Sequence, residues 1–470
     1  MTPLENTIVA PATLPGTGAI TVIRLAGPDA FALADKVFRS GAGSLSDAPG
    51  GVLRHGFAVS EDGSVLDEVV VSLFRAPHSY TGEDCVEFSC HASPYVASAL
   101  VSRLCALGAR CAEAGEFTRR AFLNGKMDLA QAESVADIIA AESSSQLRLA
   151  MNQLRGGYSK ELKDLRESLL ELTALLELEL DFSEEEVEFA SRSKLELLCS
   201  AAAIRCRSLA DSFRIGNAVR TGIPVAIAGE PNSGKSTLLN TLLGDDRAIV
   251  TDIPGTTRDT LEETCVVDGL LFRFIDTAGI RESADKVETL GIERTFKKIS
   301  QAQIVLYLVD LTLPLDAIRS SVGRVMRLVD FSCQKLVILA NKADLVAANK
   351  DVNNINDIVL SFGLEGVDVP VIKLSAKSGE GFDNLRKELV SGLSERLSSS
   401  VLVTNARHAS ALSAAADSLE AVRRGLSLQI SGDLLAEDLR DALRSLGTIT
   451  GEVTTDEVLG TIFSRFCIGK

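Results

Sequence analysis

Three patterns of apolar spacing follow one another along the 470-residue chain. Residues 1 to about 120 contain short apolar runs, such as 19–25 and 68–74, separated by Gly and Pro. Such punctuation is typical of strands and turns in a mixed domain. From about 121 to 216, stretches rich in Ala, Leu and Glu, such as 127–151 and 162–180, keep a helical spacing almost without Gly or Pro. We expect a small α+β domain followed by long helices.

Strand-like runs alternate with helical patterns from about 217 to 392. The apolar runs are 224–228, 271–275, 304–309, 336–339 and 369–374. This alternation predicts a mostly parallel sheet with helices on both faces. Helical spacing returns after 393, in 412–428 and 434–446. We therefore predict an N-terminal α+β domain (1–120), a helical domain in two parts (121–216 and 393–470), and an α/β domain inserted between them (217–392).

Charge and composition narrow the class of protein. Acidic residues outnumber basic ones by 64 to 48, a net charge of -16, so any contact with nucleic acid must be local or shared with a partner. No apolar run reaches the length of about 18 residues expected of a membrane span, and residues 1–6 lack the basic start of a signal peptide. We expect a cytosolic protein. The nine cysteines include no C-x-x-C pair, so no disulfide framework or zinc site is expected. The acidic run 181–188 is interpreted as a solvated helix end or turn.

A phosphate-binding loop follows the apolar run 224–228. Residues 229–237 read G-E-P-N-S-G-K-S-T and fit the pattern G-x-x-x-x-G-K-[ST], with a helix expected to begin near Leu238. The glycines let backbone N–H groups surround a β-phosphate, Lys235 supplies a positive charge, and Ser236 offers a hydroxyl to Mg²⁺. The context of strand, loop and helix predicts a P-loop nucleotide site in a Ras-like domain.

Four shorter motifs follow in the order that a guanine-nucleotide site requires. Thr256 and Thr257 lie in P-G-T-T-R-D and can supply the switch hydroxyl to Mg²⁺. D-T-A-G at 276–279 ends an apolar run and can place a carboxylate behind the metal. N-K-A-D at 341–344 ends another, and its carboxylate can accept two N–H bonds from guanine. S-A-K at 375–377 can close over the base.

Together the motifs predict a GTPase that uses GTP and Mg²⁺, with Ser236 and Thr257 as the metal ligands. The expected GTP-binding residues are Asn232, Ser233, Gly234, Lys235, Ser236, Thr237, Thr251, Asp252, Ile253, Pro254, Gly255, Thr256, Thr257, Asp276, Thr277, Ala278, Gly279, Asn341, Lys342, Asp344, Ser375, Ala376 and Lys377.

The group that positions the attacking water is not fixed by spacing. Ile280 stands where Ras-like enzymes carry a catalytic Gln. Glu282, Asp285 and Glu288 lie in the segment that follows, and each could orient water directly or through a second water. The residues alone leave the choice among them open.

The whole chain resembles the MnmE (TrmE) family of tRNA-modification GTPases. The likeness rests on the GTPase motifs, N-T-I-V-A at 6–10, Y-T-G-E-D at 80–84, G-E-F-T-R-R-A-F-L-N-G-K at 115–126 and the final C-I-G-K. It implies an N-terminal domain that dimerises and binds a folate of the 5-formyl- or methylene-tetrahydrofolate type. It also implies a complex with a flavin-containing partner of the MnmG (GidA) type, which adds an aminomethyl or carboxymethylaminomethyl group to C5 of the wobble uridine of certain tRNAs.

The resemblance also implies roles for individual residues. Glu288 matches the water-orienting carboxylate of the family. The family's potassium site matches Asn232, Thr251, Ile253 and Thr256. The folate-contacting positions match Arg24, Glu87, Lys126 and Lys470.

Two further positions carry expectations of their own. Cys467 belongs to the C-terminal signature, which suggests a catalytic role whose nature the sequence does not define. Residues 91–94 read His-Ala-Ser-Pro where relatives carry His-Gly-Gly-Pro, which puts in doubt any role that needs a close backbone approach there, and His91 is interpreted as structural.

Two other functions fit part of the sequence. A ribosome-assembly GTPase of the Era or EngA kind shares the phosphate-binding loop and switch threonines, but it predicts a basic RNA-binding appendage where this chain has acidic helices. A GTP-dependent binding switch without tRNA chemistry would carry the same nucleotide motifs.

Overall fold

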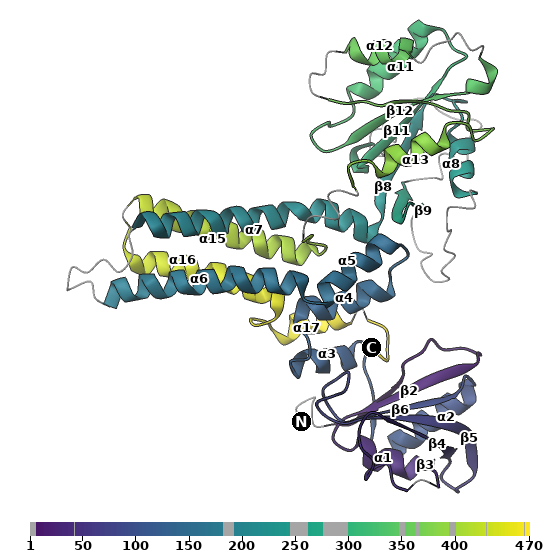
Figure 1. Cartoon of the computed structure of the whole chain (residues 1–470), viewed down its shortest axis with the longest axis vertical. Helices are drawn as coiled ribbons and strands as arrows, with labels where there is room; N and C mark the ends of the chain where they lie inside the picture. Colours follow the sequence, from purple (N-terminus) through teal and green to yellow (C-terminus); the bar gives the residue numbers. More distant parts are fainter. Residues whose placement is uncertain are drawn as a thin grey trace. The chain divides into compact units, whose positions relative to one another are not determined.

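The computed structural model describes residues 6–41, 43–181, 192–244, 262–275, 299–346, 353–362, 367–393, 401–428, 430–464 and 466–470. The chain separates into two compact units. Unit 1 contains 1–136, 152–203 and 414–470, and unit 2 contains 137–151 and 204–413. Each unit therefore combines segments that are distant in sequence, as an inserted domain requires (Figure 1).

Unit 1 begins with a seven-stranded sheet in the order β3-β4-β5-β6-β2-β1-β7, antiparallel except where β1 and β7 run parallel. Helices α1 (Ala30–Val37) and α2 (Pro94–Ala106) pack on the sheet and share its apolar core. The strands are β1 (Ile8–Pro11), β2 (Ile20–Ala26), β3 (Phe38–Arg39), β4 (Val52–Val59), β5 (Val65–Phe74), β6 (Cys85–His91) and β7 (Arg110–Cys111). The predicted mixed N-terminal domain is confirmed.

The helical part of unit 1 joins segments from both sides of the insertion. Helix α6 (Gly157–Asp181) packs along α16 (Gly432–Thr450), so the discontinuous helical domain is confirmed. Helices α3 (Glu116–Leu123) and α17 (Asp456–Phe463) also lie in unit 1. Helices α4 (Leu129–Ile139), α5 (Ser144–Leu154), α7 (Arg192–Thr221) and α15 (Ala406–Ser427) have residues in both units. Most of the acidic run 181–188 lies outside the described residues.

The expected single helix over 127–151 is wrong, because the chain breaks between α4 and α5. Ser143 and Gln146 form a capping box at the break. The Gln146 side-chain oxygen accepts from the Ser143 N–H at 2.9 Å, and the Ser143 hydroxyl accepts from the Gln146 N–H at 3.3 Å. Because these bonds satisfy N–H groups that a helix start leaves exposed, a new helix begins here.

Unit 2 holds a six-stranded sheet in the order β13-β12-β11-β8-β10-β9, parallel except for the antiparallel pair β9 and β10. The strands are β8 (Ile223–Gly229), β9 (Glu263–Val267), β10 (Leu270–Phe274), β11 (Ile304–Asp310), β12 (Lys335–Asn341) and β13 (Val371–Lys373). The helices named below are α8 (Lys235–Leu243), α11 (Leu315–Met326), α12 (Asn353–Leu360) and α13 (Phe382–Val390).

Alternate residues of the central strands enter two separate cores. Leu306 and Leu308 of β11 pack with α8 and α13, whereas Val305, Tyr307 and Val309 pack with α11 and α12. A sheet buried on both faces reads as a continuous apolar run, which explains why these strands could be predicted. Strand β9 was not predicted. The sequence feature that indicates this strand is the turn Asp268-Gly269, which connects β9 to β10. Both turn residues have positive φ.

Candidate functional site

The phosphate-binding loop depends on glycine at both ends. Gly229 has a φ of 150° and Gly234 a φ of 103°, and Gly234 is the N-cap of α8. A Cβ at Gly229 would lie 2.6 Å from the carbonyl oxygen of Leu308 on the neighbouring strand. Any side chain would therefore push the loop away from the sheet. The loop lies between a parallel strand and a helix N-terminus, which favours binding of an anion.

Lys235 is held across this loop. Its Nζ donates to the carbonyl oxygens of Gly229 at 3.0 Å and Glu230 at 2.8 Å. Ser236 is half-buried and Thr237 is exposed on the first turn of α8. This helix begins at Lys235, three residues before the start that the sequence predicted. The ammonium group and the N-terminus of α8 thus place positive charge on one loop, where a polyphosphate can be bound.

Asn341 joins three of the predicted motifs. Its side chain is buried, and its Nδ2 donates to the Ser233 carbonyl oxygen at 2.7 Å. Its Oδ1 accepts from the Ala376 N–H at 2.9 Å. One amide therefore connects the phosphate-binding loop to the segment expected to close over the base. Asn341 acts through these neighbours, a positioning role that the sequence did not specify.

The guanine-recognition motif is ordered around Asp344. The Ser375 hydroxyl donates to Asp344 Oδ1 at 2.7 Å. Lys342 has a φ of 65° and its Nζ lies 2.5 Å from Asp310 Oδ2. Partial burial opposes ionisation of Asp310, but hydrogen bonds from Lys342 and Thr312 outweigh it and lower its pKa. The structure thus brings Asp344 beside Ser375, as base binding requires, and leaves Lys377 exposed.

Several predicted site residues lie outside the described residues. These are Thr251, Asp252, Ile253, Pro254, Gly255, Thr256, Thr257, Asp276, Thr277, Ala278, Gly279 and Glu288.

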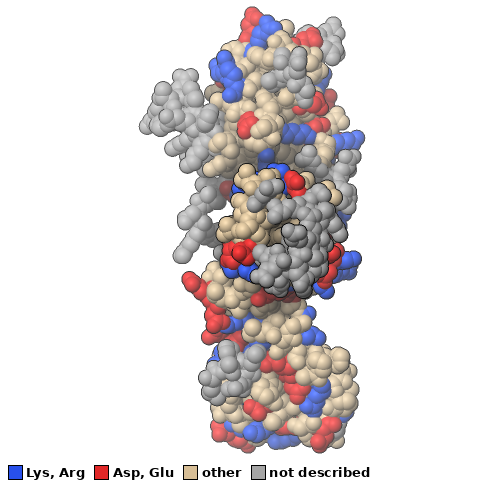
Figure 2. All heavy atoms as spheres, turned by 90° about the vertical axis from the view of Figure 1, so that its left-hand side faces the viewer, with Lys and Arg blue, Asp and Glu red and all other residues tan. Residues whose placement is uncertain are grey.

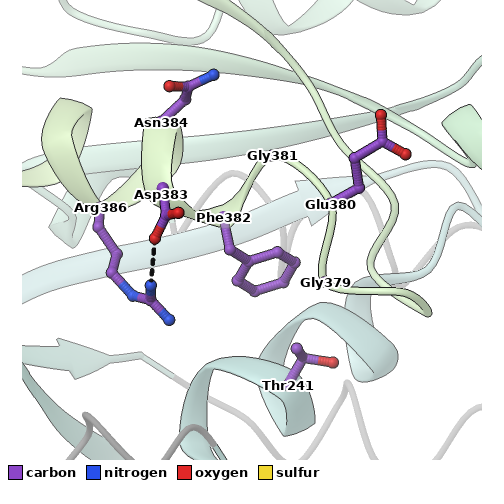
Figure 3. A pocket seen from close by; sticks show the side chains of 8 residues that line it. All are labelled: Thr241, Gly379, Glu380, Gly381, Phe382, Asp383, Asn384 and Arg386. Atoms are coloured by element: carbon purple, nitrogen blue, oxygen red, sulfur yellow. Dashed lines mark hydrogen bonds and ion pairs between the residues drawn. The ribbon is translucent and has the colours of Figure 1, made fainter.

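A pocket of about 440 Å³ lies beside the base-closing segment, between α8 and the start of α13 (Figure 3). Thr241 of α8 lines it, and its hydroxyl donates to the Ala376 carbonyl oxygen at 2.9 Å. Glu380 and Asp383 also line it, and Asp383 is paired with Arg386 at 2.8 Å. Arg386 also lines the pocket and offsets one of the two carboxylates, so its charged lining stays negative, and we assign the polyphosphate to the glycine loop and not to this pocket.

The positions matched to folate contacts partly cluster in unit 1. Arg24 of β2 lies opposite Glu87 of β6, with Arg24 Nε 2.7 Å from Glu87 Oε1. The Arg24 guanidinium also lies over the rings of Tyr80 and Phe117, 5.0 and 5.4 Å from their centroids. Phe117 is fully buried and supports Arg24 from within the core, whereas Arg24, Glu87 and the half-buried Tyr80 offer a planar cation, a carboxylate and an aromatic ring that suit a flat heterocycle with amide and amino groups.

The C-terminal segment lies against the same sheet. Ile468 forms a β-bridge with Ala114, and a Cβ at Gly469 would meet the Pro11 carbonyl oxygen at the end of β1. Cys467 is exposed, and its carbonyl oxygen accepts from the Gly115 N–H at 3.4 Å. The structure therefore places the residues before Lys470 next to the strand that pairs with β2. Lys126 Nζ donates to the Pro77 carbonyl oxygen at 2.9 Å.

A buried ionic network supports this cluster and was not predicted from the sequence. The Arg120 side chain is 1% exposed, lies 3.1 Å from carboxylate oxygens of both Glu83 and Glu116, and donates to the Asn6 carbonyl oxygen at 2.7 Å. Burial raises the pKa of Glu83. Glu116 is also held by Arg110, and the pKa of Glu116 is lowered although burial opposes this. The network connects residues 80–84, which include Tyr80, to helix α3, which includes Phe117.

Replacing Arg120 with Leu is expected to lower the free energy of unfolding of unit 1 by about 3 kcal/mol, because the largely buried Glu83 loses its ion pair and Glu116 keeps only the one with Arg110. Urea unfolding followed by circular dichroism measures the loss. Arg119→Leu is the matched control. Its ion pair with the exposed Asp456 is 3.6 Å long, and its loss should cost less than about 1 kcal/mol. Equal losses in the two variants would contradict the assigned role of the network.

The surface carries charged side chains of both signs. On the face drawn in Figure 2, Lys and Arg are interspersed with Asp and Glu. Within the described ranges, no helix is both long enough and apolar enough to cross a membrane.

The sheet order, the glycine loop and the Asn341 and Asp344 contacts define a P-loop guanine-nucleotide-binding protein. Two family models match the chain: the N-terminus of the GTP-binding protein TrmE over residues 7–126, and the MnmE helical domain over 129–467. Two curated relatives, from Parabacteroides distasonis and Bacteroides thetaiotaomicron, are each 48% identical over 472 residues, covering 99% of this chain and 100% of the relative. Both are named tRNA modification GTPase MnmE. The chain therefore belongs to the MnmE family of tRNA modification GTPases, and it is a GTP-hydrolysing enzyme.

Solved structures add little to this assignment. A crystal structure of Era with MgGDPNP and ribosomal RNA is 28% identical and covers 36% of this chain and 55% of its own, but its TM-score is 0.27. That score is too low to support a conclusion. The full-length family match sets aside a ribosome-assembly GTPase of the Era or EngA kind.

Proposed function

We propose that this GTPase serves the modification of wobble uridine in tRNA. In this proposal it works with a flavin-containing partner of the MnmG (GidA) type and adds an aminomethyl or carboxymethylaminomethyl group to C5 of the base. The observation that supports it most is the 48% identity over nearly the whole chain with proteins named tRNA modification GTPases. We place this work in the cytosol, with the tRNA.

The nucleotide site would act through its own residues as follows. Lys235 and the first N–H groups of α8 hold the phosphates. Asp344 accepts hydrogen bonds from the guanine N–H groups. Asn341 holds the phosphate-binding loop and the base-closing segment in position relative to each other. Ser236 and Thr257 would hold Mg²⁺, which supplies charge neutralisation at the phosphates when it is bound. Glu288 would orient the attacking water.

The N-terminal domain would bind the one-carbon donor. Arg24 and Glu87, with the ring of Tyr80, fit a folate of the 5-formyl- or methylene-tetrahydrofolate type, and Lys126 and Lys470 would complete its binding. The folate would supply a one-carbon unit when bound. Cys467 is exposed on the segment that lies against the end of β1, the neighbour of the strand that carries Arg24, which supports a role in the same chemistry.

We further propose a homodimer with four segments: a dimerising N-terminal domain (1–120), helical parts (121–216 and 393–470) and the GTPase domain (217–392). Two GTPase domains would approach face to face in a K⁺-dependent manner, with Asn232, Thr251, Ile253 and Thr256 as the K⁺ site. Asn232 supports this, because it lies in the phosphate-binding loop with a φ of 61° and is exposed.

Steady-state GTP hydrolysis should be faster in K⁺ than in Na⁺, because a cation beside the phosphates offsets the charge that develops during hydrolysis. Asn232→Gly tests the site sharply. Glycine tolerates the positive φ but removes the amide oxygen, so the preference for K⁺ should fall while the loop is kept. Equal wild-type rates in the two salts would remove the potassium site and leave a GTPase with another activator.

A further inference from the structure

Cys105 and Cys111 place their sulfur atoms side by side in unit 1. The two Sγ atoms are 3.5 Å apart and both thiols are free. Cys111 is exposed and Cys105 is half-buried, whereas Cys85, Cys90, Cys199, Cys206 and Cys265 are buried. Among the described residues, the other cysteine contacts join a sulfur to an oxygen: Cys90 to the Thr21 carbonyl and Cys333 to the Asp330 carboxylate. This pair therefore combines proximity with access from solvent.

The backbone holds Cys105 at the end of α2. Gly108 has a φ of 121°, its N–H donates to the Cys105 carbonyl oxygen at 3.1 Å, and the Ala109 N–H donates to the Leu104 carbonyl oxygen at 3.0 Å. These two bonds form a Schellman motif, which fixes the last turn of a helix.

The backbone holds Cys111 on the edge strand β7. Val9 of β1 lies opposite Cys111 in parallel register, and the Val9 carbonyl oxygen accepts from the Ala112 N–H at 3.0 Å. The two cysteines thus keep their positions without any help from a covalent bond. Once one of the two is oxidised to a sulfenic acid, the neighbouring thiol attacks it faster than a dissolved thiol does, because the two sulfurs are already held together.

We propose that Cys105 and Cys111 form a reversible intramolecular disulfide when the protein meets a peroxide. The Cys111 thiolate attacks one peroxide oxygen, giving a sulfenic acid and, with a proton, one water. The Cys105 thiol then attacks the Cys111 sulfur, the S–S bond forms, and the hydroxyl leaves as a second water. The two thiols lose two protons and two electrons, and these reduce the peroxide to two waters. Closure requires the sulfurs to approach from 3.5 Å to about 2.05 Å.

The different surroundings of the two thiols determine the order of these steps. Burial raises the pKa of Cys105 to about 11, so this thiol is the poorer first nucleophile at neutral pH. Cys111 is exposed and meets the oxidant first. Cys105 is then the resolving thiol, already in contact.

The disulfide would link the C-terminal end of α2 covalently to β7. Strand β7 is the edge of its sheet and also carries Arg110, which pairs with Glu116. The disulfide therefore constrains a strand whose Arg110 is connected through Glu116 to Arg120. These residues belong to unit 1, whereas the phosphate-binding loop belongs to unit 2. This inference does not rest on the proposed function.

The test uses the full-length protein treated with hydrogen peroxide, blocked with iodoacetamide and digested without reductant. Mass spectrometry should find a peptide pair joined through Cys105 and Cys111, which dithiothreitol separates. The oxidised wild type should unfold at a higher temperature than the reduced wild type. That difference should vanish in Cys105→Ser and in Cys111→Ser, and persist in the control Cys333→Ser.

Two results would overturn the proposal. One is Cys111 recovered as sulfinic or sulfonic acid while Cys105 is alkylated. The other is Cys111 joined to Cys467 or to a second chain. The comparison of oxidised with reduced wild type decides the question even if Cys105→Ser does not fold.

Discussion

Replacing Glu288 with Ala is expected to lower the rate of GTP hydrolysis by on the order of 10²–10⁴-fold, the contribution typical of a positioned general base, while GTP binding is kept. The chain has Ile280 where Ras-like enzymes carry a water-positioning Gln, so another group must do this work, and the family resemblance assigns it to Glu288. Glu288 itself lies outside the described residues. Single-turnover hydrolysis and fluorescent-nucleotide binding measure the two effects separately.

Glu282→Ala and Asp285→Ala are the matched controls, because the spacing of the sequence alone leaves all three carboxylates as candidates. They should keep hydrolysis near the wild-type rate. A large loss in either control with an active Glu288→Ala would move the catalytic role to that residue.

Replacing Asp344 with Asn is expected to weaken GTP binding by on the order of 10²–10⁴-fold, because two hydrogen bonds to a charged acceptor, about 1.5–3 kcal/mol each, are lost. Asp344 is placed for this role, since Ser375 donates to one of its oxygens from the base-closing segment. Isothermal titration with GDP and GTP measures the change.

The Asn variant also offers its own control. An amide N–H can donate where the carboxylate accepted, so xanthosine nucleotides, which carry a carbonyl in place of the guanine amino group, should bind Asp344→Asn better than GTP. An equal loss for both bases would show that the substitution disturbed the loop and that Asp344 does not read the base.

The parts of the fold that could be predicted are those determined by local pattern. Strands β8, β11 and β12 are buried on both faces, so their apolar runs are continuous and readable. The break between α4 and α5 is also local, and Ser143 with Gln146 was a readable capping box that the helical spacing around it obscured. Strand β9 has a weaker pattern and depends on pairing with β10.

The parts of the site that could not be predicted depend on distant pairing. Asn341 bonds to Ser233 and Ala376 only because parallel strands end at one edge of the sheet. Arg24 meets Glu87 only through the register of β2 and β6. Arg120 reaches Asn6 across more than a hundred residues, and nothing in the spacing of single charges reveals that the network is buried.

The central claim is that this GTPase site serves the modification of wobble uridine. Nucleoside mass spectrometry of tRNA from a strain that lacks the chain tests it most directly, with wild type or Lys235→Ala supplied on a plasmid. We expect unmodified wobble uridine in the deletion strain, restored modification with wild type, and none with Lys235→Ala, because the variant loses the charge that holds the phosphates. Wobble uridine that stays fully modified in the deletion strain would contradict the account and leave a GTP-dependent switch without tRNA chemistry.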